Sequence, residues 1–235
     1  MNKHSFKKID FILLGLILLV ATIMRSYAIS APLADFHSWR QADTAAVARN
    51  FERNGFDLLH PTYDDLTNLQ SGMDNPQGYR FVEFPVYNAL FAFLHSVAPI
   101  VSLETWGRIV SVFFSLICIA SLYYLALMET GRPTALFTGI TYAIMPFFVY
   151  FSRVILPDTP AIACAIAALA LLHMFTTTQS KNGKVLFFMF SCMLFSVSLL
   201  MKPTTIFYAL PIFVLLSKNI NMHFQKNCIF YFISF

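Results

Sequence analysis

The sequence is poor in charge, since charged residues fill only 12% of its 235 positions. A soluble domain carries about 25% charged residues. Hydrophobic residues make up 57% of the chain and the mean hydropathy is +0.64, which is more apolar surface than a water-soluble fold of this length could bury. The composition therefore excludes a soluble globular protein and predicts an integral membrane protein. In such a chain a net charge of +4 does not indicate a nucleic-acid partner.

The motifs that mark several known catalytic centres are also missing. The sequence contains no Gly-rich phosphate-binding loop, no HExxH, no GxSxG and no EF-hand loop. The cysteines lie in apolar stretches without metal-ligand spacing and are expected to be core residues: Cys118, Cys164, Cys192 and Cys228. The sequence does not predict a specific cofactor, and a divalent metal ion is kept as an alternative.

What the sequence has instead is a series of long apolar runs. A helix needs roughly 20 apolar residues to cross a bilayer. The first run covers residues 11–24 and extends to about Ile29, which is too long for a signal peptide and predicts a retained span. Five further spans are predicted along the chain: residues 105–128, 134–151, 159–175, 185–201 and 204–217. The fold class is therefore an all-α, polytopic membrane helix bundle of about six transmembrane helices.

The topology depends on whether residues 84–103 cross the membrane. Asn88, His95 and Pro99 favour a short juxtamembrane helix on the outer face instead. The turns that are then cytoplasmic carry a set of basic residues, namely Arg132, Lys181, Lys184, Lys218 and Lys226. If residues 84–103 span, these basic turns move outside, against the positive-inside rule. We therefore expect a multi-pass plasma (inner) membrane protein with a cytoplasmic N-terminus and an external loop over residues 30–104.

The first loop opens with the segment DFHSWRQADTAAVARNF, residues 35–51. A Ser-x-x-Gln capping box at Ser38 predicts a helix from about Trp39 to Arg53 that Gly55 stops. Its alanines and Phe suit a helix that lies on the bilayer surface, with Asp43 at the interface. The alternative is that Asp43 pairs with a neighbouring arginine on its own helix and only solvates it.

Three more charged clusters are predicted on the same outer face. Asp158 precedes a span and follows Arg153 by five residues, Lys202 begins the turn KPT, and Glu83 precedes Pro85. Ionisable groups at membrane depth are costly and more often functional than on a soluble surface. Each also has a structural interpretation, because Asp158 can favour a helix N-terminus and Lys202 can extend to the headgroups. Glu83 can likewise be a plain N-terminal charge.

The order of these features resembles a known family. A first span ends near Arg25, and a helix ending in AVARNF is followed by GFDLLHP, EFPVYNAL, WGRIVSVFFSLICIASLYYLALM, SRVILPD and KPT. This order resembles the polytopic GT-C glycosyltransferases, in particular the family 39/83-like protein mannosyltransferases and lipid A aminoarabinose transferases. The resemblance covers about residues 8–217, so residues 1–217 are expected to form a GT-C-like module. Residues 218–235 are expected to be a cytoplasmic turn and the start of a truncated seventh span, as in the N-terminal half of such an enzyme.

The resemblance implies transfer of a hexosyl or pentosyl group from a polyprenyl-phosphate carrier to a lipid, glycan or protein acceptor on the outer face. It implies that a carboxylate of the first loop, Asp43 or alternatively Asp35, deprotonates the acceptor hydroxyl. Asp158 would support this site as a second catalytic carboxylate. The residues expected to bind the substrate, including the cations for the carrier phosphate, are Glu83, Arg40, Arg153 and Lys202. The acidic pair that the family commonly carries in this helix is replaced here by Arg40 and Gln41.

Two other classes of membrane protein are alternatives. A transporter or flippase subunit would place ionisable residues midway through its spans. A purely structural subunit would need no acidic residues in the outer loop. The predicted spans are nearly free of charge and the charges gather at one face. This distribution favours the enzyme.

Overall fold

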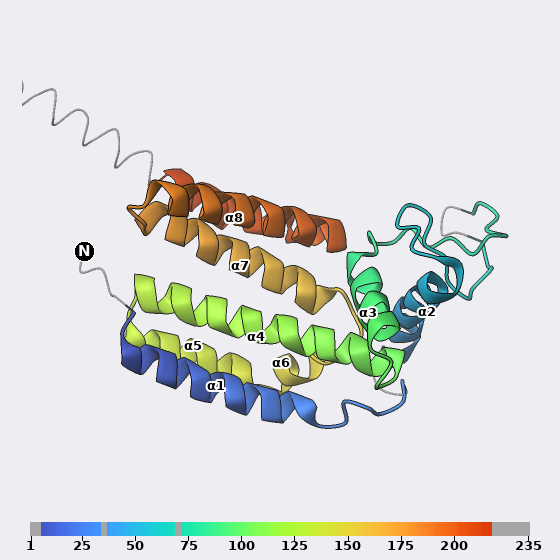
Figure 1. Ribbon diagram of the computed structural model, residues 1–235, viewed down its shortest axis with the longest axis horizontal. Helices are drawn as coiled ribbons and strands as arrows, with labels where there is room; N and C mark the ends of the chain where they lie inside the picture. The colour runs from blue at the N-terminus through green and yellow to red at the C-terminus, as the bar shows by residue number, and fades with distance from the viewer. Residues whose placement is uncertain (1–5, 34–36, 69–71, 218–235) are drawn as a thin grey trace, which may run out of the picture.

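The computed structural model describes residues 6–33, 37–68 and 72–217. These residues are organised as helices, with no named β-strand among them (Figure 1). The helices that are long and apolar enough to cross a membrane are α1 (Lys8–Ser26), α4 (Leu103–Glu129), α7 (Asp158–Thr177) and α8 (Lys181–Met201). The prediction of an all-α membrane helix bundle is confirmed, and the chain is an integral membrane protein.

Two of the six predicted spans are not continuous long helices. Residues 134–151 are divided between α5 (Arg132–Ile144) and α6 (Pro146–Phe151), because Pro146 has no backbone N–H with which to continue α5. Residues 204–217 begin as the 3₁₀ helix η1 (Pro203–Tyr208) and continue as helix to Ser217, the last described residue. The predicted turn and seventh span, residues 218–235, lie outside the described part of the chain.

The long helices and α5 lie side by side, and two shorter helices cover one end of this bundle (Figure 1). These are α2 (Ser38–Asn54) and α3 (Val86–Val97), and we call the end that they cover the loop end. With 12 residues, α3 is shorter than a membrane span requires, which agrees with the juxtamembrane helix predicted there. The opposite end holds the start of α1 and the turns that join α4 to α5 and α7 to α8.

The start of α2 differs from the prediction. Its N-cap is His37, in the left-handed conformation at φ 58°, and Ser38 is already the first helical residue. Gln41 was expected to complete the capping box, but it is fully buried and its Oε1 accepts a hydrogen bond from the Ile155 backbone N–H at 3.1 Å. This tertiary bond satisfies a buried amide, which is why the local cap does not form. Gly55 ends the helix as predicted, at φ 97°.

The apolar face of α2 is covered by protein. Ala45, Ala48 and Phe51 are all buried, and Phe51 belongs to the same core cluster as Tyr87 and Phe91 of α3. The prediction that this face lies on the bilayer is therefore wrong, because α3 and α4 provide the apolar partner that the sequence alone did not show.

The segment between α6 and α7 is fixed against α4. Ile155 approaches Gly107 so closely that a Cβ there would lie 3.0 Å from the Ile155 Cγ2, so only glycine fits without displacement. Ser111 donates to the Val154 carbonyl at 2.9 Å, and the Tyr87 hydroxyl donates to the Gly107 carbonyl at 2.8 Å. These contacts hold the start of α7, and with it Asp158, in place at the loop end.

Candidate functional site

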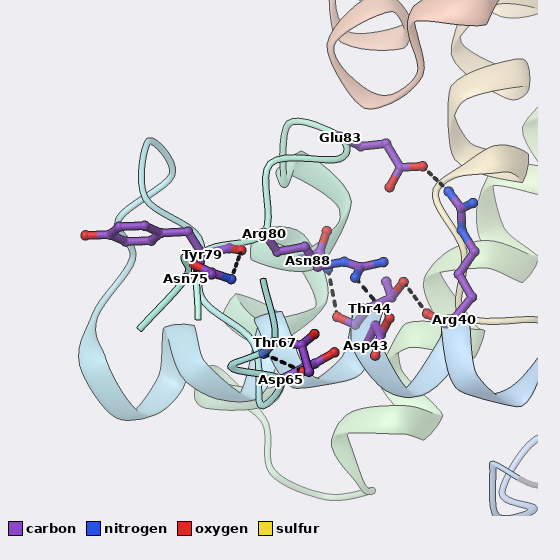
Figure 2. Close-up of polar contacts among 10 residues, drawn as sticks. All are labelled: Arg40, Asp43, Thr44, Asp65, Thr67, Asn75, Tyr79, Arg80, Glu83 and Asn88. Carbon is purple, nitrogen blue, oxygen red and sulfur yellow. Dashed lines mark hydrogen bonds and ion pairs between the residues drawn. The ribbon is translucent and has the colours of Figure 1, made fainter. Parts of the chain in front are cut away.

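Two ion pairs join α2 to the segment that precedes α3 (Figure 2). Arg40 pairs with Glu83, and Arg80 Nη1 donates to Asp43 Oδ2 at 2.9 Å. The alternative that Asp43 pairs with Arg40 on its own helix is therefore wrong. Each partner comes from residues 79–83, so the two carboxylates and two guanidinium groups form one network across the two elements.

Asp43 lies in a partly buried, polar environment. Burial raises the pKa of the Asp43 carboxyl above its usual range, and the nearby Arg80 guanidinium opposes this effect. Arg80 is itself held over the ring of Tyr63, with 5.0 Å between its guanidinium carbon and the ring centroid. No local sequence pattern identifies Arg80 as a site residue, because its partner Asp43 lies 37 positions away.

A third ion pair joins the start of α7 to the end of α8. Lys202 Nζ donates to Asp158 Oδ1, and both side chains are partly exposed. The sequence placed Asp158 and Lys202 on one face of the membrane, and the structure brings them into contact.

A cavity of about 490 Å³ is bordered by Arg40 and by the Lys202–Asp158 pair. Its charged and polar lining includes Arg40, Lys202, Asp158 and Thr159, together with His37. Much of the remaining lining forms an aromatic wall, and its members are Tyr142, Phe147, Phe148, Phe151 and Tyr208. A pocket with an apolar wall and a few convergent polar groups is typical of a ligand site. Asp43 and Glu83 are not lining residues, although Glu83 holds the guanidinium of one that is.

The aromatic wall exists because the helix is broken between α5 and α6, and Arg25 stabilises the break. Pro146 leaves carbonyls at the end of α5 without their helical N–H partners. The fully buried Arg25 donates to the carbonyls of Tyr142 and Ala143, each at 2.9 Å, and its Nε donates to Ser152 Oγ at 2.6 Å. An arginine at the end of an apolar run was the available signal, but its role depends on a break that the sequence analysis did not predict.

Arg153 is a predicted site residue that the structure separates from both the cavity and the ion-pair network. Arg153 lies over the rings of Tyr27 and Tyr150, at 5.5 and 5.7 Å from their centroids, and donates to the Tyr27 carbonyl. It does not line the cavity, so we leave it out of the candidate site. Asp35 lies outside the described residues, so the alternative between Asp43 and Asp35 stays open.

No group of three or more His, Cys, Asp or Glu side chains that could hold a metal ion is found in the part of the chain that the structure describes. The charged lining of the cavity instead offers two cations and one carboxylate, Asp158. Cationic side chains of this kind bind phosphate and carboxylate groups. The arrangement therefore suits an anionic ligand with an apolar portion.

Comparison with known families supports this interpretation. Residues 82–235 match the sequence model of the family described as dolichyl-phosphate-mannose-protein mannosyltransferase, which is more than half of the chain. The matched region begins at the segment that holds Glu83 and includes Asp158 and Lys202, whereas α2 precedes it. No curated protein and no solved structure matches the chain.

Proposed function

We propose, since the chain belongs to the dolichyl-phosphate-mannose-protein mannosyltransferase family, that its loop end transfers a sugar from a polyprenyl-phosphate carrier to a lipid, glycan or protein acceptor. Membership makes the chain a membrane glycosyltransferase of the GT-C type. The observation that carries the proposal is the cavity, which combines an aromatic wall with two cations at one end of the bundle.

The cavity suits both parts of such a donor. An isoprenoid chain is apolar and would contact the aromatic wall. Its phosphate would lie near Arg40 and Lys202, which donate charge-assisted hydrogen bonds. Negative charge accumulates on the leaving phosphate as the sugar–oxygen bond breaks, and fixed cations stabilise that charge. Both cations are paired with carboxylates in the structure, so donor binding would share or replace Glu83 and Asp158 as partners.

Asp43 is the proposed general base for the acceptor hydroxyl. It lies one helical turn from Arg40, and burial raises the pKa of its carboxyl, which makes the carboxylate a stronger base. Asp158 borders the cavity itself and is held by Lys202, so we assign it to donor binding. Asp35 is kept as the alternative base.

We also propose that the loop end faces outward from the plasma membrane. The opposite end carries a set of basic residues: Lys8, Arg132, Lys181 and Lys184. Cytoplasmic ends of membrane helices are enriched in Lys and Arg. This orientation would present the cavity to a donor and an acceptor on the outer face.

A transferase assay tests the assignment of the base. Membranes containing the protein are incubated with polyprenyl phosphate mannose that carries a radiolabelled sugar. We expect Asp43→Asn to lower the turnover rate by about 10²–10⁴-fold, because a positioned general base contributes that much. Asp64→Asn is the matched control, since Asp64 also pairs with an arginine, here Arg49 of α2, but its side chain is 56% exposed against 28% for Asp43. Full activity of Asp43→Asn would reject this residue as the base.

A further inference from the structure

Apolar side chains are exposed on the loop that precedes α3, outside the helix bundle. Leu59, Phe81 and Val82 are exposed by 70%, 59% and 53%. They belong to one cleft of about 360 Å³. The cleft is also lined by Leu199 and Leu200 at the end of α8 and by Pro203 at the start of η1. The exposed side chains therefore gather where the loop meets a membrane helix.

This cleft continues the lipid-facing surface of α8. The Phe84 backbone N–H donates to the Leu200 carbonyl at 3.2 Å, which fixes the loop to the last turn of the helix. Along the rest of α8 a row of large apolar side chains is exposed: Val185, Leu186, Met189, Phe190, Met193 and Leu200. In an integral membrane protein such a face contacts acyl chains. The loop residues extend that apolar surface beyond the end of the helix.

Part of the loop backbone is hydrogen-bonded within the protein. Lipid cannot hydrogen-bond exposed backbone groups, so a segment at membrane depth must satisfy its own. The Asp57 carboxylate accepts from the backbone N–H groups of Leu59 and His60, at 3.0 and 3.2 Å. The Arg80 N–H donates to the Pro61 carbonyl at 2.8 Å. The charged Asp57 stays exposed nearby, which limits the loop to the depth of the headgroups and the first part of the acyl chains.

We propose that Leu59, Phe81 and Val82 insert into the lipid leaflet at the loop end, so that phospholipid acyl chains fill the cleft between them and α8. This anchor is independent of the catalytic proposal. It has a consequence for the cavity, because Val82 adjoins Glu83, and Glu83 holds Arg40. The depth at which the loop enters the leaflet therefore sets the position of one cavity cation relative to the membrane.

Photocrosslinking of the full chain in phosphatidylcholine vesicles tests this anchor. Leu59→p-benzoylphenylalanine and Phe81→p-benzoylphenylalanine are irradiated, and adducts are identified by mass spectrometry. The same replacement at Leu66 and Met73 is the matched control, since these side chains are exposed by 63% and 62% but do not line the cleft. We expect phospholipid adducts at positions 59 and 81 to exceed those at 66 and 73 at least several-fold.

A second variant separates contact with lipid from a general loss of structure. In the protein that carries p-benzoylphenylalanine at position 81, Val82→Asp should lower the yield of phospholipid adducts several-fold. Met73→Asp in the same protein should leave that yield unchanged. Equal phospholipid labelling at all four positions would overturn the proposal. So would adducts at 59 and 81 that join to protein, because a second copy or another protein segment would then cover the cleft.

Discussion

Both ends of the helix bundle contain ion pairs, but the pairs at the two ends differ in how deeply they are buried. At the opposite end, Asp10 is fully buried and receives two hydrogen bonds from Arg132, at 2.7 and 3.2 Å, and a third from the Lys7 backbone N–H at 2.9 Å. This arrangement ties the start of α1 to the start of α5. At the loop end, the Arg40–Glu83 and Lys202–Asp158 pairs are partly exposed and border or support a cavity.

The difference separates a structural role from a functional one. A buried carboxylate that accepts three hydrogen bonds, as Asp10 does, cannot exchange its partner without loss of stability. A partly exposed pair at a cavity is worth little to stability and is free to exchange one partner for a ligand. We therefore expect changes at the loop end to alter catalysis and changes at the opposite end to alter folding.

The largest effect at the loop end, after loss of the base, is expected for Lys202→Met. It removes one proposed ligand of the donor phosphate, and a hydrogen bond to a charged group contributes about 1.5–3 kcal/mol. We expect the KM for the polyprenyl-phosphate sugar to rise about 10–100-fold while the melting temperature changes little. Lys184→Met is the control, since Lys184 lies at the other end of the same helix. An equal rise in KM for both variants would contradict the functional difference between the two ends of the bundle.

Asp10→Asn at the opposite end is expected to lower stability and to leave activity unchanged. The amide cannot serve as acceptor for all three of the donors that the carboxylate satisfies, so α1 and α5 lose their charged link. Thermal unfolding in detergent should show a melting temperature several degrees lower. The transfer rate per folded molecule should stay at the wild-type value. A selective loss of activity with unchanged stability would show that this end also takes part in the reaction.

A smaller effect on activity is expected for Arg80→Gln, which tests whether the ion-pair network at the loop end controls the pKa of Asp43. Arg80 opposes the rise in the pKa of Asp43 that burial causes, so its loss raises that pKa further. A base must be deprotonated to act, and a higher pKa means that deprotonation requires a higher pH. The acid limb of the pH–rate profile should therefore move to higher pH. Arg49→Gln is the control, since Arg49 lies on the same helix but pairs with Asp64 instead of Asp43, and it should leave the acid limb unchanged.

Much of the bundle could be predicted from the sequence because apolar length is a local property. The runs at residues 105–128, 159–175 and 185–201 correspond to α4, α7 and α8, with differences only at their ends. The predicted sides of the membrane also placed Asp158 and Lys202 together. Alternating spans bring residues of distant turns to one face, and this rule does not require contacts to be known.

The remaining features depend on contacts between distant residues. Gln41 seemed to cap its own helix, yet it bonds to Ile155, 114 positions away. Arg25 seemed to mark the end of a span, yet it holds the carbonyls at the break between α5 and α6. The alternative interpretation of Asp43 paired it with Arg40 on its own helix, whereas its partner is Arg80. In each case a buried or partly buried polar group has a tertiary partner that no local pattern specifies.

Binding of undecaprenyl phosphate to the purified protein tests the central claim most directly, because it needs neither the sugar nor the acceptor. Arg40→Met and Arg49→Met form a matched pair: both arginines lie on α2, both pair with a carboxylate, and their side chains are exposed by 28% and 33%. Only Arg40 lines the cavity. We predict that Arg40→Met weakens binding about tenfold or more while Arg49→Met binds as the wild type does. Equal affinity of the two variants would contradict the assignment of the cavity as the donor site.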